Sequence, residues 1–120
     1  MKKKKFWANK NVLITGITGF VGSNLAKNLI ALGANVTGIS KSQKIESLFF
    51  YEDINKRCNL VYGNLVDKEF IKNTLRKHKI EICFHLAAQI EVGHAKSYPF
   101  ETWESNIRGT YTFLEAIRTS

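Results

Sequence analysis

Long apolar runs are missing from this chain of 120 residues, so no segment is long enough to cross a lipid bilayer as a helix. A secretory leader is not expected either. Lys2–Lys5 imitate the charged start of one, but Phe6-Trp7-Ala8 is too short for its apolar region, and no small-residue cleavage site follows. We therefore expect a cytoplasmic protein without a membrane partner.

Cysteine is scarce. Cys58 and Cys83 show neither a Cys-x-x-Cys spacing nor the spacing of metal ligands. Both lie in or beside apolar strand segments, so we expect them to be buried free thiols. No second histidine, cysteine or carboxylate stands at a metal-ligand spacing from His85. The sequence therefore predicts no metal site.

Acidic residues are few as well. The chain has ten acidic residues and 18 lysines and arginines, which gives a formal net charge of +8. Such an excess raises the question of nucleic-acid binding. However, half of it comes from Lys2–Lys5, which we expect to be a solvated tail, and no further basic run alternates with aromatic residues. We expect no nucleic-acid partner.

The chain does contain a glycine-rich turn between an apolar strand and a helix. The segment Thr15-Gly16-Ile17-Thr18-Gly19-Phe20-Val21-Gly22 follows the apolar residues Val12–Ile14. Gly16 would allow a tight turn, Gly19 would let backbone approach a phosphate, and Gly22 would let the helix pack close to its strand. The free N–H groups and the positive dipole end of the helix would face the anion. A turn without a ligand is the alternative, but the strand–helix junction favours a dinucleotide site.

The rest of the chain alternates strands and helices. This order predicts an α/β fold, namely the N-terminal part of a Rossmann-type doubly wound parallel sheet, with about four strands and their flanking helices. Strands are expected at 11–15, 35–39, 59–62 and 81–85, and helices at about 20–32, within 45–55, after 67 and from 97 onward. Helical spacing predicts one buried face made of Val21, Leu25, Leu29 and Leu32, and one stripe made of Phe100, Trp103, Ile107, Thr110, Leu114 and Ile117.

An acidic residue is missing at the end of the second strand, where dinucleotide folds commonly hold the adenosine ribose. Ser40 stands there, with Lys41 beside it. A serine hydroxyl can hydrogen-bond a ribose, whereas Lys41 would either pair with a 2′-phosphate or be one more solvated lysine. The cofactor is therefore NAD or NADP, with NAD slightly favoured. After the third strand, Asn64 and the Leu65 backbone can reach an adenine edge, and Asp67 can cap the next helix.

The fourth strand ends in His85, and Leu86-Ala87-Ala88-Gln89 follow it. Small residues at the carboxyl end of a strand let a ligand lie against the backbone, where the crevice of such a sheet opens. For His85 we favour a hydrogen bond to a neighbouring loop over a role as catalytic base or metal ligand. Asn106 lies off the stripe of the last helix, either as a solvated residue or as a side chain that supports the cofactor loop.

Four motifs, in this order, resemble the N-terminal part of the extended short-chain dehydrogenase/reductase family, the NAD-dependent epimerases and dehydratases. They are Thr15-Gly16-x-x-Gly19-Phe20-Val21-Gly22, Gly63-Asn64-x-x-Asp67, His85-Leu86-Ala87-Ala88-Gln89 and Asn106-x-x-Gly109-Thr110. The Phe6-Trp7 opening, the Ala88-Gln89 pair and Leu114-Glu115-Ala116 resemble the nucleotide-sugar dehydratases and epimerases, with CDP-glucose and GDP-mannose 4,6-dehydratases as the nearest examples. The resemblance covers nearly the whole chain.

The resemblance implies a cofactor site in which the backbone of Gly19–Val21 holds the pyrophosphate. Leu86–Ala88 would line the nicotinamide, and Gln89 would lie near the sugar nucleotide. The full set is Gly16, Thr18, Gly19, Phe20, Val21, Gly22, Ser40, Lys41, Asn64, Leu65, Leu86, Ala87, Ala88, Gln89 and Asn106. The chain departs from the family where Asn64 replaces a usual aspartate, Val21 replaces a lysine associated with CDP-glucose dehydratases, and Ala95 replaces a frequent serine.

The Tyr-x-x-x-Lys pair, which in this family takes a proton from a sugar hydroxyl as hydride leaves carbon, is missing. Residues Asn55, Val66, Thr102 and Glu115 stand four positions after the tyrosines. No catalytic residue is therefore expected in 1–120, the N-terminal part of an NAD(P)-binding Rossmann domain whose catalytic segment and substrate domain are absent.

The resemblance implies a fragment, inactive alone, of an enzyme that acts on a nucleotide sugar. The full enzyme would form a homodimer through the last helix, whose apolar stripe would then be exposed in this chain. The alternative is a stand-alone dinucleotide-binding or sensor module without catalysis.

Overall fold

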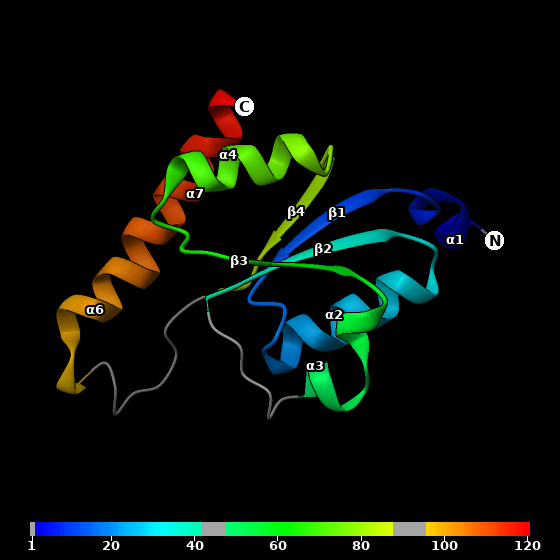
Figure 1. Cartoon of the computed structure of the whole chain (residues 1–120), viewed down its shortest axis with the longest axis horizontal. Helices are drawn as coiled ribbons and strands as arrows, with labels where there is room; N and C mark the ends of the chain where they lie inside the picture. Colours follow the sequence, from blue (N-terminus) through cyan, green and yellow to red (C-terminus); the bar gives the residue numbers. More distant parts are fainter. Residues whose placement is uncertain (1, 42–47, 88–95) are drawn as a thin grey trace.

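A parallel sheet of four strands forms the centre of the computed structural model, which describes residues 2–41, 48–87 and 96–120 (Figure 1). The strands are β1 (Asn11–Thr15), β2 (Asn35–Ser40), β3 (Asn59–Tyr62) and β4 (Ile82–His85), and their spatial order is β3-β2-β1-β4. The helical elements are α1 (Lys2–Trp7), α2 (Phe20–Ala31), α3 (Leu48–Tyr51), the 3-10 turn η1 (Ile54–Lys56), α4 (Lys68–Lys77), α6 (Pro99–Trp103), the π-helical turn η2 (Glu104–Arg108) and α7 (Gly109–Thr119). The Rossmann-like α/β fold predicted from the sequence is confirmed.

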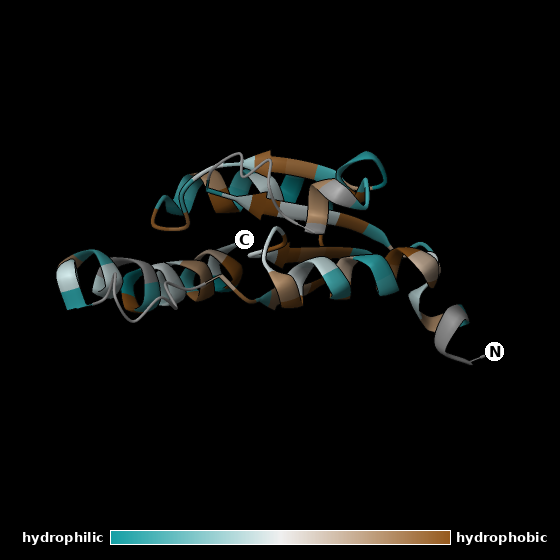
Figure 2. Ribbon diagram, turned by 90° about the horizontal axis from the view of Figure 1, so that it is seen from below, coloured by the Kyte–Doolittle hydropathy of each residue, from teal (hydrophilic) through white to brown (hydrophobic). Residues whose placement is uncertain are grey.

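Two apolar cores cover the two faces of the sheet. Successive side chains of a strand point to opposite faces, and β1 shows this alternation. Val12 and Ile14 pack with α2, α3 and η1, whereas Leu13 packs with α4 and α7. Figure 1 shows these two helix layers on either side of the strands, and the strands are the most apolar parts of the ribbon in Figure 2. Both faces of β1 are therefore buried, as its uninterrupted apolar run predicts.

The buried face of α2 differs from the predicted one. Val21 is exposed, and the fully buried residues are Gly22, Ser23, Ala26 and Leu29. Small residues turn toward the sheet because they let the helix axis approach the strands, and hydrophobic spacing does not register them. The predicted end of this helix is correct: Gly33 has φ +89°, and the Ala34 N–H donates to the Leu29 carbonyl at 3.0 Å.

Several boundaries also differ from the sequence-based expectation. Lys2–Lys5, expected to be a solvated tail, belong to α1, and Trp7 at the end of this helix packs on Phe84 with ring centroids 6.3 Å apart. The helix expected within 45–55 is split into α3 and η1.

No helix among the described residues has the length and apolar character needed to span a membrane.

The last helical segment contains a π-helical turn that the sequence pattern did not predict. α6, η2 and α7 follow one another without a break, and α7 packs against α4. Of the predicted stripe, Thr110 is half-buried, whereas the five large apolar side chains are exposed: Phe100, Trp103, Ile107, Leu114 and Ile117. The expectation of an uncovered apolar stripe on this chain is therefore confirmed.

The N-terminus of α4 offers a first test of the local structure. The Asp67 carboxylate accepts a hydrogen bond from the Phe70 N–H at 3.1 Å, so it caps the helix as predicted. We expect Asp67→Ala to lower the free energy of unfolding by about 1 kcal/mol. Asp67→Asn keeps a capping oxygen, so its free energy of unfolding, measured by urea denaturation, should stay within about 0.5 kcal/mol of the parent value. Equal losses in both variants would contradict the capping role.

Candidate functional site

The glycine-rich turn lies where β1 and β4 end side by side. Gly16 has φ +70°, and a Cβ there would stand 2.9 Å from the backbone of both Leu86 and Ala87. A Cβ on Gly22 would stand 2.2 Å from the Gly16 carbonyl oxygen. This geometry agrees with the roles predicted for both glycines, namely a tight turn and close helix packing. It also places Leu86 and Ala87 against Gly16, in the turn that leads into α2.

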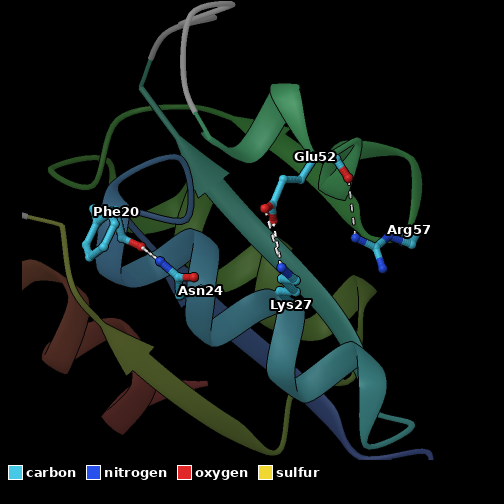
Figure 3. A network of polar contacts seen from close by, with 5 residues as sticks. All are labelled: Phe20, Asn24, Lys27, Glu52 and Arg57. Atoms are coloured by element: carbon cyan, nitrogen blue, oxygen red, sulfur yellow. Dashed lines mark hydrogen bonds and ion pairs between the residues drawn. The ribbon is translucent and has the colours of Figure 1, made fainter.

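The first turn of α2 presents uncapped amide groups. Gly19 is the N-cap in an extended conformation and forms no side-chain capping bond, and the first turn holds no acidic residue. The Ser23 N–H donates to the Gly19 carbonyl at 2.9 Å, so the N–H groups of Phe20, Val21 and Gly22 precede the helical hydrogen-bond series. The Asn24 side chain binds the Phe20 carbonyl and not these amides (Figure 3). The turn therefore carries the partial positive charge that attracts anions.

The two side chains that begin α2 are largely exposed. Phe20 is 78% exposed and Val21 is 64% exposed. Further along α2, Lys27 pairs with Glu52 at 3.1 Å and links the helix to the segment after α3 (Figure 3). This pair is largely exposed, so it contributes about 0–1 kcal/mol and does not shape the site.

The place of the turn in the sheet matches a nucleotide crevice. β1 has β2 on one side and β4 on the other, and Thr15 is in register with Ile39 and with His85. The chain therefore adds β2 and β3 on one side of β1, and later adds β4 on the other side of β1. Open α/β sheets bind ligands at such a switch point, beyond the carboxyl ends of the strands.

The residues predicted to hold the adenosine half lie at the ends of β2 and β3. Ser40 pairs with Tyr62, and its carbonyl accepts the Gly63 N–H at 3.1 Å. Ser40 is only 6% exposed, whereas Lys41 is exposed. The Asn64 side-chain oxygen accepts the Val66 N–H at 3.1 Å and so closes its own turn. Ser40 and the start of the Asn64 turn are thus adjacent.

The remaining predicted residues fall in three places. Thr18 and Leu65 are half-buried, and Leu65 packs on the core beneath α4. Asn106 is half-buried in η2, where its carbonyl accepts the Thr110 hydroxyl at 2.8 Å. Ala88 and Gln89, like Ala95, lie outside the described residues.

His85 binds two threonines rather than a loop, which corrects the predicted partner. Its Nδ1 lies 2.8 Å from the Thr15 hydroxyl at the end of β1, and its Nε2 lies 3.2 Å from the Thr110 hydroxyl on α7. The ring stacks on Phe113 with centroids 4.9 Å apart. Burial lowers the pKa of His85 below its ordinary value of 6.5. Thr15 and Thr110 were not predicted as partners, although each stands in one of the motifs.

Metal binding finds no support in this arrangement. Among residues 2–41, 48–87 and 96–120, no three of the side chains of histidine, cysteine, aspartate or glutamate gather closely enough to hold an ion. Cys58 and Cys83 are free thiols of intermediate exposure, and burial raises the pKa of Cys58 to about 11. Both thiols therefore remain protonated and uncharged at neutral pH.

The parallel sheet and the glycine-rich turn define a Rossmann-like protein of the short-chain dehydrogenase/reductase class. A family model described as GDP-mannose 4,6 dehydratase matches residues 13–120. The chain belongs to this family of nucleotide-sugar dehydratases and epimerases.

Individual relatives agree with this assignment. CDP-glucose 4,6-dehydratase of Salmonella typhimurium is 37% identical over 119 residues, which cover 98% of this chain and 33% of that protein. dTDP-D-glucose 4,6-dehydratase of Dictyostelium discoideum is 34% identical over 117 residues, covering 91% of this chain and 26% of the relative. The chain thus spans about a third or less of the length of the curated relatives it matches.

Solved structures show the same fold. An epimerase from Methanothermobacter thermautotrophicus superposes with a TM-score of 0.83 at 30% identity, covering 99% of this chain and 34% of its own. A UDP-glucose-4-epimerase from Stenotrophomonas maltophila, solved with bound NAD and formylated UDP-arabinopyranose, gives a TM-score of 0.82 at 25% identity, with coverages of 92% and 34%. Structural relatives of this chain therefore bind NAD.

Proposed function

We propose that this chain is the NAD-binding part of a nucleotide-sugar 4,6-dehydratase or epimerase. The observation that carries the proposal is the exposed first turn of α2, which has no side-chain cap and follows the Gly16 turn that lies against Leu86 and Ala87 at the switch point of the sheet. In such an enzyme, bound NAD would supply reversible hydride transfer at the sugar C4. Residues 1–120 would be the N-terminal part of the dinucleotide domain, with the catalytic tyrosine–lysine pair and the substrate domain on other parts of the enzyme. The predicted cytoplasmic location stays a prediction.

The N–H groups of Phe20 and Val21 would hold the pyrophosphate, because they lack partners within the helix. Gly22 matters for the diphosphate as well, but indirectly. A Cβ at this position would collide with the Gly16 carbonyl, so α2 and the amides of its first turn would have to move. Ser40 and Lys41 would face the adenosine ribose, and we favour NAD over NADP. Asn64 and Leu65 would contact the adenine, and Asn106 would support the cofactor loop. Leu86–Gln89 would line the nicotinamide and the sugar nucleotide.

Calorimetric titration of the chain with NAD and with NADP tests the proposal. A part of a dinucleotide site should bind NAD with a dissociation constant above about 1 μM, or more weakly than about −8.2 kcal/mol. Absence of heat at millimolar NAD would contradict the cofactor assignment. Sub-micromolar binding by a monomeric chain would instead favour the stand-alone dinucleotide-binding module.

The exposed apolar stripe supports a homodimer of the full enzyme, which we include in the proposal. Trp103 is 64% exposed and Leu114 is 60% exposed, about three turns apart on one helical segment. Contiguous apolar patches of this kind on soluble proteins commonly mark protein interfaces. A second copy of the chain would cover the stripe with its own.

We expect the doubly substituted variant Trp103→Lys, Leu114→Lys to weaken self-association of the chain by about tenfold or more, because lysines cannot be buried unpaired in an apolar interface. Sedimentation equilibrium over a range of concentrations measures this change. Asn28→Lys adds a lysine to the exposed face of α2 and should leave the association unchanged. A chain that stays monomeric at every concentration would contradict the proposed interface.

A further inference from the structure

The hydroxyl group of Thr15 has three hydrogen-bond partners among the described residues, and their identities fix the direction of each bond. Its oxygen lies 3.0 Å from the Leu86 nitrogen and 3.1 Å from the Ala87 nitrogen, both of which can only donate. The Leu86 N–H is shared with the Thr15 backbone carbonyl at 3.2 Å. A threonine hydroxyl offers two lone pairs and one proton. Because the amides use both lone pairs, the proton of Thr15 is left for the Nδ1 of His85, at 2.8 Å.

The same reasoning fixes the tautomer of His85. A neutral imidazole that accepts at Nδ1 carries its proton on Nε2. This Nε2–H points to the Thr110 oxygen at 3.2 Å, and the Thr110 hydroxyl donates a hydrogen bond to the Asn106 carbonyl at 2.8 Å. The result is a one-way series of hydrogen bonds from Thr15 through His85 and Thr110 to η2.

The surroundings of His85 favour the neutral ring. It stacks on Phe113 of α7, and no charged side chain of the described residues contributes to its lowered pKa, which burial causes. Cys83, two residues earlier on the same strand, has a pKa raised by burial and stays neutral. A second ring proton would stand on Nδ1, opposite a Thr15 oxygen without a free lone pair.

We propose that His85 is a positioning residue for the dinucleotide site. As the Nε2–H tautomer it orients the Thr15 hydroxyl, which holds the Leu86 and Ala87 amides in the turn that lies against Gly16. Through Thr110 it ties this turn to η2. The identity of the ligand, NAD, depends on the proposed function. The tautomer of His85 and the hydrogen bonds of the Leu86 and Ala87 amides do not depend on it.

Protonation of His85 should therefore loosen the Leu86–Ala87 turn. Because folding lowers the pKa of His85, the unfolded chain takes up this proton more readily, so the associated stability is present above pH 6.5 and is lost as pH falls below it. Affinity for NAD should fall over the same acid range, since the turn lies against the site.

Nuclear magnetic resonance of the 15N-labelled chain tests the series without any ligand. We expect the Nε2–H tautomer for His85. We also expect the protection factor of the Ala87 amide, its intrinsic exchange rate at each pH divided by the measured rate, to fall about tenfold when the ring becomes protonated, as for the loss of one hydrogen bond. Thr15→Val should accelerate Ala87 exchange similarly, and Thr15→Ser should restore it. An Nδ1–H tautomer would overturn the proposal, and so would an Ala87 protection factor that does not change as His85 titrates.

The ligand arm compares the pH dependence of NAD affinity in the parent chain, in His85→Asn and in the matched control His78→Asn. The parent and the control should lose about tenfold in affinity as His85 titrates, and His85→Asn should give a flat profile. A parent profile that persists in His85→Asn would overturn the positioning role. If no variant binds NAD, the proposed function fails, and the amide exchange still decides whether His85 orders the turn.

Discussion

Gly22→Ala should lower the free energy of unfolding by about 3 kcal/mol, the upper end of what overpacking usually costs. The reason is geometric, because the added methyl group would stand 2.2 Å from the Gly16 carbonyl oxygen. This obstacle is backbone, which cannot rotate away as a side chain can. Relief would require α2 to move from β1, which would also displace the amides of its first turn. We therefore expect NAD binding to be lost even at temperatures where the variant is still folded.

Urea denaturation followed by circular dichroism measures the first effect, as a shift of the midpoint at unchanged slope. Asn28→Ala is the matched control, because Asn28 is exposed on the same helix and alanine raises helix propensity there. The control should be as stable as the parent chain or slightly more so. A Gly22→Ala variant with the parent midpoint would mean that helix and turn are not packed as the structure shows.

Val21→Asp should change stability and affinity in opposite directions. Val21 is 64% exposed in the first turn of α2, so its replacement removes little buried surface. A carboxylate at this end of a helix interacts favourably with the helix dipole and should add about 0.3–1 kcal/mol of stability. The same charge would repel a diphosphate, and we expect NAD affinity to fall by at least about tenfold, or 1.4 kcal/mol.

Val21→Asn separates charge from shape in this experiment. Its side chain has nearly the same size as aspartate and no charge, so its NAD affinity should stay within about threefold of the parent value. Raising the ionic strength should narrow the gap between the two variants, because the repulsion is screened. Equal NAD affinity in Val21→Asp and the parent chain would show that the anion does not bind at this turn.

Much of the fold was predictable because its signals are local. The apolar run at 11–15 and the segment at 59–62 match β1 and β3, since both are bounded by turn-forming residues. Asp67 was predictable as a cap from its place before an amphipathic helix. Gly16 and Gly22 follow from the strand–turn–helix motif, and the structure adds the atoms that a Cβ would meet.

The rest depended on contacts that sequence patterns do not carry. The prediction of the buried face of α2 was wrong at Val21, because small residues rather than large ones approach the strands. The partners of His85 are Thr15, 70 residues away, and Thr110, 25 residues away, so only the folded topology brings them together. Likewise, local spacing shows no sign of the π-helical turn at Glu104–Arg108, which directly precedes α7, the helix that packs against α4.

The most direct test of the account is to follow the backbone amides of the chain by nuclear magnetic resonance while NAD is added. The account predicts that the largest shifts fall on Phe20, Val21 and Gly22, whose N–H groups precede the helical hydrogen bonds of α2. Smaller shifts should follow at Leu86 and Ala87. Saturable shifts confined to other parts of the chain, or no shifts at millimolar NAD, would contradict it.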